Sequence, residues 1–261
     1  MPPLNMHLLI GERLFPLLQA EQGGKARLAP FLAGNLIVDA NSFTALPRPA
    51  THLVSREEEP RGLGYRRFIA TAPRLLRRPP AALTPEEMAL ASGYLAHLAA
   101  DAFWKATLHR LYRRLGIASW RDLPFPADVF LTEISVLCTP RFADFPRLAR
   151  AMQRYRRLPP LFAHVPHAAL QRTWQIGRTV LQRPYRRSSY YAMLALKGLP
   201  QAEIEAVEAA HRRYGDEARR AILGWGDLDA WLAHIVTNAE AVLREWWQSL
   251  AADRTATAKR D

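Results

Sequence analysis

A histidine and an aspartate four residues apart interrupt an otherwise apolar segment at residues 91–104, ASGYLAHLAADAFW. On a helix, His97 and Asp101 project from one face, one turn from each other. A buried carboxylate is costly unless a partner neutralises it. Two arrangements meet that need: a hydrogen bond between the two side chains inside the core, or a divalent cation that both bind together with further ligands.

Apolar residues recur at helical spacing along most of the chain, which predicts an all-α fold. The long helix that carries His97 begins with Thr84 as N-cap, Pro85 at its first position and Glu87 three residues after the cap, and it runs to about Gly116. Strands are not expected, because no segment alternates convincingly and no Asn-Gly or Asp-Gly hairpin turn occurs. Further helices are predicted at residues 6–19, 27–37, 65–78, 127–137, 142–157, 168–182, 187–197, 201–223 and 227–250.

The length of 261 residues, of which 49% are hydrophobic, allows one large domain. We expect a single multi-helix domain over residues 1–252 and a disordered polar tail at 253–261. The single cysteine, Cys138, excludes an intrachain disulfide and a Cys-rich zinc site, so metal ligands would have to be His, Asp or Glu. Neither a signal peptide nor an apolar run of membrane-spanning length is found, which predicts a cytoplasmic protein.

A formal net charge of +12 favours anionic partners, such as phospholipid headgroups, nucleic acid or phosphorylated metabolites. Tyr155, Trp174 and Tyr185 lie among the arginines, where they suit base stacking, a membrane interface or the core. A solvated basic surface without a partner is the alternative. Four arginines three or four residues apart would form one basic helical face: Arg147, Arg150, Arg154 and Arg157.

Five residues of metal-ligand type stand in order along the first half of the chain: His7, Asp39, His52, His97 and Asp101. Imidazole nitrogen and carboxylate oxygen suit zinc and related cations. In their local sequences, MHLLIGE (6–12), FLAGNLIVD (31–39), RPATH (48–52) and GYLAHLAAD (93–101), the chain resembles the zinc-dependent phospholipase C family. That all-helical fold is shared with single-strand-specific zinc nucleases, and the chain is most similar to the family's short intracellular bacterial members. The resemblance covers about the first 115 residues.

The resemblance implies that these five residues are ligands of one or two zinc ions, or of another divalent metal, with Asp101 able to bridge two ions. It also implies that Asp39 is the catalytic carboxylate that orients or deprotonates the attacking water. In the family's secreted members the free N-terminal amine is a ligand, and no signal peptide whose removal would create that terminus is expected here. The family's further histidine shortly after HxxxD and its later HxxxE motif are not evident in the sequence. Glu133, in an apolar helix, is the expected additional ligand, and a salt bridge to an arginine is the alternative.

These features together predict a metal-dependent phosphoesterase of the phospholipase C type, with a metal-site half at residues 1–115 and an additional basic helical half at 116–252. The expected substrate contains phosphate, with phospholipid favoured over nucleic acid, and a peripheral contact with an anionic membrane is expected. Two alternatives stay open: a nuclease of the same fold, and a non-catalytic helical interaction protein that a metal stabilises. Four further histidines are assigned to packing or to the surface: His164, His167, His211 and His234.

Overall fold

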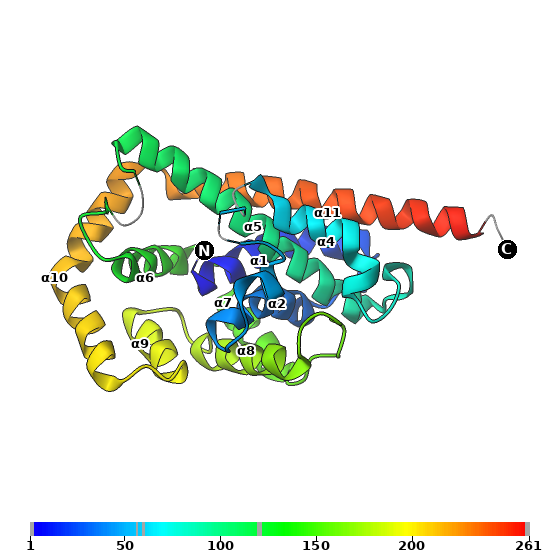
Figure 1. Cartoon of the computed structure of the whole chain (residues 1–261), viewed down its shortest axis with the longest axis horizontal. Coiled ribbons are helices and arrows are strands. Elements are labelled where there is room, and N and C mark those ends of the chain that lie inside the picture. Colours follow the sequence, from blue (N-terminus) through cyan, green and yellow to red (C-terminus); the bar gives the residue numbers. More distant parts are fainter. Residues whose placement is uncertain (1–2, 56, 59–60, 119–121, 259–261) are drawn as a thin grey trace.

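The computed structural model describes residues 3–55, 57–58, 61–118 and 122–258, and helices make up almost all of its regular structure (Figure 1). Within this described part, β structure is limited to one antiparallel bridge between Leu76 and Phe162. The predicted all-α class is therefore confirmed. The helices are α1 (Leu4–Glu21), α2 (Leu28–Ile37), η1 (Val38–Ser42), α3 (Arg48–His52), α4 (Leu63–Leu75), η3 (Pro80–Ala82), α5 (Pro85–Leu115), α6 (Ala127–Cys138), η5 (Thr139–Arg141), α7 (Phe145–Arg154), α8 (His167–Val180), α9 (Arg187–Leu196), α10 (Gln201–Trp225) and α11 (Leu228–Ala258).

Helix α5 begins and ends where the sequence predicts. The Oγ1 of Thr84 accepts a hydrogen bond from the backbone N–H of Glu87, and the Glu87 carboxylate accepts one from the backbone N–H of Thr84. Gly116 follows its last turn with a left-handed φ of 68°. Such caps satisfy backbone groups that the helix leaves unpaired. Every residue from Glu87 to Ala102 is buried, so His97 and Asp101 lie in the core.

Helices α2 and α5 touch through their backbones at two glycines. A Cβ atom at Gly34 would overlap the carbonyl oxygen of Leu90, and one at Gly93 would overlap the carbonyl oxygen of Phe31. Only glycine permits this approach, because any side chain would push the two helices apart. The close crossing brings the Asn35 carbonyl of α2 against the His97 ring of α5.

The second half of the chain packs directly onto the first. α11 runs along α5 and also contacts α1, as the long orange and red helix of Figure 1 shows. Helices α7 and α8 pack on α2, and α10 packs on α6. One hydrophobic core results, and Trp104, Trp174 and Trp246 are almost completely buried in it. Cys138 is also buried, and burial raises the pKa of its thiol to about 12, which fits a core residue.

Two segments differ from the sequence-based expectations. The stretch expected to be irregular, residues 46–64, contains the short helix α3, which Leu53 ends with a left-handed φ of 63°; residues 56 and 59–60 of it lie outside the described part. α11 continues to Ala258, although disorder was expected from Asp253, because extending a formed helix needs only one more residue per hydrogen bond. Residues 259–261 of that tail are not among those described. None of the helices described is both long and apolar enough to cross a membrane.

Candidate metal centre

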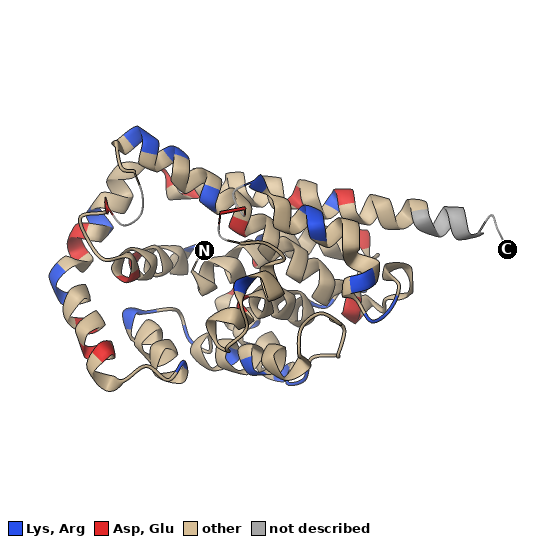
Figure 2. Cartoon of the chain, in the orientation of Figure 1, with Lys and Arg blue, Asp and Glu red and all other residues tan. Residues whose placement is uncertain are grey.

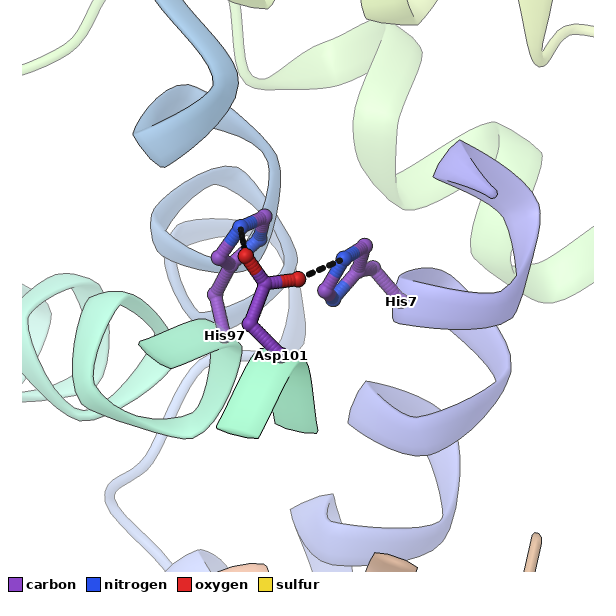
Figure 3. Close-up of side chains that lie close together, drawn as sticks. All are labelled: His7, His97 and Asp101. Carbon is purple, nitrogen blue, oxygen red and sulfur yellow. Dashed lines mark ion pairs between the residues drawn. The ribbon is translucent and has the colours of Figure 1, made fainter. Parts of the chain in front are cut away.

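Four separate elements bring the five predicted ligand residues together. His7 comes from the first turn of α1, Asp39 from η1 and His52 from the last residue of α3, while His97 and Asp101 are one turn apart on α5. All five are at most 3% exposed. They form two overlapping groups, His7–His97–Asp101 and Asp39–His52–His97, and in each group one ligand atom per residue lies within 4.8 Å of the others. Figure 3 shows the first group, with Asp101 reaching both imidazoles.

The distances between imidazole nitrogens and carboxylate oxygens are too long for hydrogen bonds. The Nε2 of His7 lies 3.4 Å from Oδ1 of Asp101, and the Nε2 of His52 lies 3.4 Å from Oδ2 of Asp101 and 3.6 Å from Oδ1 of Asp39. Hydrogen bonds of this type measure about 2.7–3.2 Å. Two ligands bound at about 2.1 Å to one tetrahedral zinc ion are separated by about 3.4 Å. The spacing therefore fits ligands that share a cation.

The atoms that face one another in the cluster have no hydrogen-bond partner among the described residues. They are Nε2 of His7, His52 and His97, and Oδ1 of Asp39 and Asp101. Buried polar atoms are nearly always satisfied, and each unsatisfied one is costly. These three nitrogens and two oxygens belong to the two overlapping groups of three residues, and donors of these types fit zinc or a related divalent ion.

Outer hydrogen bonds aim two of the imidazoles. The Nδ1 of His97 lies 2.7 Å from the carbonyl oxygen of Asn35, and the Nδ1 of His52 lies 2.9 Å from Oγ1 of Thr51. Occupation of Nδ1 leaves Nε2 to face the cluster, as is usual for metal-binding histidines. The His7 ring stacks on the His97 ring at 3.7 Å between centroids. Nε2 of His97 belongs to both groups but can bind only one ion. His97 can therefore serve as a ligand in one group at a time.

The electrostatics of the cluster keep its carboxylates ionised. Burial lowers the pKa of His97 to about 3, so this imidazole is neutral at neutral pH. Burial would raise the pKa of Asp39 and of Asp101, but the imidazoles around them outweigh that effect, and both pKa values lie below their usual range. A neutral imidazole beside ionised carboxylates is the protonation state that binds a cation.

Arg48 is a member of the cluster that sequence analysis did not identify. Its guanidinium donates a 2.6 Å hydrogen bond to Oδ2 of Asp101, and its side chain is 7% exposed. The sequence RPATH could have indicated this, because Arg48 and His52 are four residues apart and therefore share a face of helix α3. The hydroxyl of Tyr94 in α5 donates to the carbonyl oxygen of Thr51, which holds α3 against α5.

Glu133 does not join this cluster. Its Oε1 accepts from Arg187 at 2.5 Å and its Oε2 from Arg219 at 3.1 Å, so both oxygens of the fully buried carboxylate are taken. This ion-pair network ties α6 to α9 and α10, and it corresponds to the salt-bridge alternative rather than to the additional ligand. Neither group of candidate ligands includes the four histidines assigned to packing or surface, His164, His167, His211 and His234.

The metal interpretation thus has a geometric basis in the chain itself. Its residues provide buried, unsatisfied donors of the kind and spacing that a zinc-type cation needs. Comparisons of the chain with protein-family models, with curated proteins and with solved structures found no match. A relationship to the zinc-dependent phospholipases therefore remains an expectation that rests on sequence motifs. The structure itself shows an all-helical fold with a buried His/Asp cluster that can hold a metal ion.

Proposed function

We propose that the chain is a metal-dependent phosphoesterase of the phospholipase C and zinc nuclease type. Its centre would consist of His7, Asp39, His52, His97 and Asp101, with zinc as the preferred ion. The observation that supports this proposal is a pair of imidazole–carboxylate distances between buried atoms that lack hydrogen-bond partners in the described part of the chain. They are 3.4 Å from Nε2 of His7 to Oδ1 of Asp101 and 3.6 Å from Nε2 of His52 to Oδ1 of Asp39. Hydrogen-bonded His–Asp pairs in a core would be closer, so a purely polar cluster explains the spacing less well.

A bound divalent ion would polarise a phosphoryl oxygen and acidify a water molecule. The residues of the chain have separate tasks in this proposal. Asp39 would bind the ion through Oδ1, which has no hydrogen-bond partner in the described part of the chain, and would orient that water or accept its proton with its other carboxylate oxygen. Arg48 would hold Asp101 through its 2.6 Å hydrogen bond and add positive charge beside the site.

The substrate class follows from charge and from the motif resemblance. A centre of this kind suits a phosphodiester, and the net charge of +12 attracts anionic substrates. Phospholipid is favoured over nucleic acid because the motifs resemble those of phospholipases. A nuclease of the same fold is the alternative within this class.

Deep burial favours a second candidate function, in which the metal only holds the helices together. His7, His97 and Asp101 have no exposed surface. Three surface cavities on the described part of the molecule, lined among others by Leu250, Trp231 and Gln171, have none of the five candidate ligands in their walls. A catalytic site must admit its substrate, whereas a structural metal site has only protein ligands.

Metal content and hydrolysis, measured on the same protein, distinguish the two functions. The purified chain would be analysed by plasma mass spectrometry and then assayed with bis(p-nitrophenyl) phosphate, phosphatidylcholine and a single-stranded oligonucleotide in zinc, manganese or magnesium. We expect hydrolysis that EDTA abolishes and that Asp39→Asn lowers about a hundredfold or more. The charge-matched control Asp216→Asn, on the exposed face of α10, should retain activity. Bound metal without turnover of any ester would support the structural function instead.

A further inference from the structure

A surface cavity of about 480 Å³ lies between α8 and the segment that precedes it, and none of the candidate metal ligands lines it. Its polar lining is basic or neutral and contains no carboxylate. Ligand sites commonly have volumes of about 300–1,000 Å³, so the cavity can take a small molecule or a headgroup. The lining residues are Arg156, Arg157, Leu158, His167, Gln171, Gln175 and Arg178.

Two short segments build this cavity. His167, Gln171, Gln175 and Arg178 follow one another by four, four and three residues, and so form one stripe on α8. The stripe begins at the first residue of a 14-residue helix, where the helix dipole is positive. Arg156 and Arg157 approach it from the connection between α7 and α8.

Hydrogen bonds fix the connection against α8. Gln171 receives the backbone N–H of Leu158 and donates to the carbonyl oxygen of Arg156, each at 2.9 Å. The Nε1 of Trp174 donates to the carbonyl oxygen of Tyr155 at 2.7 Å. These bonds use backbone groups of the connection and leave its two guanidinium groups for other contacts. The arrangement is therefore built before any ligand arrives, which reduces the entropy cost of binding.

The arginines of the cavity are not paired with carboxylates of the described residues. Residues 145–202 contain ten arginines, one lysine and neither Asp nor Glu. In the part of the chain that the structure describes, Arg156, Arg157 and Arg178 form no ion pair within 4.0 Å. Burial and the charge of Arg156 lower the pKa of Arg178, as expected where like charges face each other. In Figure 2 helix α8 carries basic residues and no acidic ones.

We propose that the cavity lined by Arg156, Arg157 and Arg178 binds a phosphate group that carries two or more negative charges. Guanidinium groups bind phosphate oxygens in pairs, and three of them around one cavity match a di- or triphosphate or a phosphorylated headgroup. The cavity is a second site, separate from the metal cluster. It does not depend on the proposed hydrolase function, because it shares no residue with that cluster.

Binding of inorganic triphosphate, followed by calorimetry at low salt, tests the site in the full chain. The double variant Arg156→Gln/Arg157→Gln should weaken binding about tenfold or more, since each guanidinium contributes charge-assisted hydrogen bonds. Both side chains are exposed, so the variant should fold like the parent. The matched control Arg172→Gln/Arg183→Gln removes the same charge from exposed positions of the same acid-free region, outside the cavity, and should change affinity about twofold or less.

A second arm uses vesicles of phosphatidylcholine with phosphatidic acid, whose phosphomonoester can carry two negative charges, and sedimentation is the measurement. If Arg156→Gln/Arg157→Gln weakens triphosphate binding, the ligand is a soluble phosphorylated molecule. If this variant weakens vesicle binding but not triphosphate binding, the ligand is a lipid headgroup. Equal losses in the two double variants, or no binding of triphosphate and vesicles, would overturn the proposal. Repeating the titration in EDTA separates the two sites, because failure of the metal centre should leave triphosphate binding unchanged.

Discussion

The guanidinium of Arg48 donates a 2.6 Å hydrogen bond to Oδ2 of Asp101, so a fixed cation of the chain already neutralises part of the candidate metal centre. The other oxygen of Asp101 has no hydrogen-bond partner among the described residues and lies 3.4 Å from Nε2 of His7. One carboxylate thus faces a permanent charge on one side and a candidate cation position on the other. The Arg48–Asp101 hydrogen bond therefore stabilises the folded cluster without a metal ion, and the other oxygen of Asp101 stays available to bind one.

Substitution Arg48→Met should destabilise the metal-free protein more than the metal-loaded protein. Without metal, the change leaves the Asp101 carboxylate buried without its charged partner, which costs about 3–5 kcal/mol. With metal, the ion supplies the missing charge, so the loss should be smaller. Urea unfolding in EDTA and in zinc measures both values. The control Arg67→Met breaks an exposed pair with Glu58 and should cost less than about 1 kcal/mol in either buffer. Equal losses for Arg48→Met in both buffers would contradict the prediction.

Removal of the His97 imidazole should release the metal and remove the stabilisation that it gives. For a ligand at about 100–1,000 times its Kd, that stabilisation is about 3–4 kcal/mol, or roughly 10 °C in Tm. We therefore expect zinc to raise the Tm of the parent chain but not that of His97→Ala, with plasma mass spectrometry showing loss of the ion. His109→Ala changes an exposed histidine of the same helix and should retain both metal and the Tm shift. A parent Tm that is identical in EDTA and zinc would argue against a metal centre.

Substitution Gly93→Ala should disturb the metal centre indirectly, by separating α2 from α5. Its methyl group would overlap the Phe31 carbonyl, and the resulting separation of α2 from α5 should cost about 1–3 kcal/mol or more. Metal content should fall as well, because Asn35 would move away from His97. The same exchange at Gly224 meets no atom within 4 Å and replaces a helical glycine, so it should be neutral or stabilise by up to about 1 kcal/mol. Unfolding curves and metal analysis of both variants provide the check.

Acid should destabilise the metal-free protein from about pH 6.5 downward. The pKa of His97 is about 3 in the folded chain, against an ordinary value of 6.5, so the unfolded chain binds the proton first. The free energy of unfolding should therefore be unaffected by this group above pH 6.5 and fall by up to about 1.4 kcal/mol per pH unit below it. Asp39 and Asp101, whose pKa values lie below the usual range, add a loss of the same sign under still more acidic conditions.

Urea unfolding at several pH values in EDTA measures this dependence. The slope between about pH 6.5 and 4.5 should decrease in His97→Gln and persist in His109→Gln, whose imidazole is exposed. A free energy of unfolding that stays constant over that range would show that His97 takes up its proton in the folded chain as easily as in the unfolded one.

Local sequence determined the helices of this protein. The capping box of Thr84 and Glu87 and the glycine at 116 define α5 through bonds between residues that are neighbours in the chain, so a sequence pattern predicts them. The same holds for the all-α class, since apolar spacing depends on helix geometry alone. The types and order of the five candidate ligands were also readable, although their convergence was expected only through motif resemblance.

Contacts between segments that are distant in the sequence decided which partners the buried carboxylates meet. Arg48 meets Asp101 across 53 residues, and Glu133 meets Arg187 and Arg219 rather than the metal cluster. The crossing at Gly34 and Gly93 determines how closely α2 approaches α5, because two backbones can touch only where no Cβ intervenes. Which charge a buried carboxylate meets depends on how whole helices pack, and no local pattern contains that information. The tertiary structure therefore decided which of two buried carboxylates, Asp101 and Glu133, faces the candidate cation position.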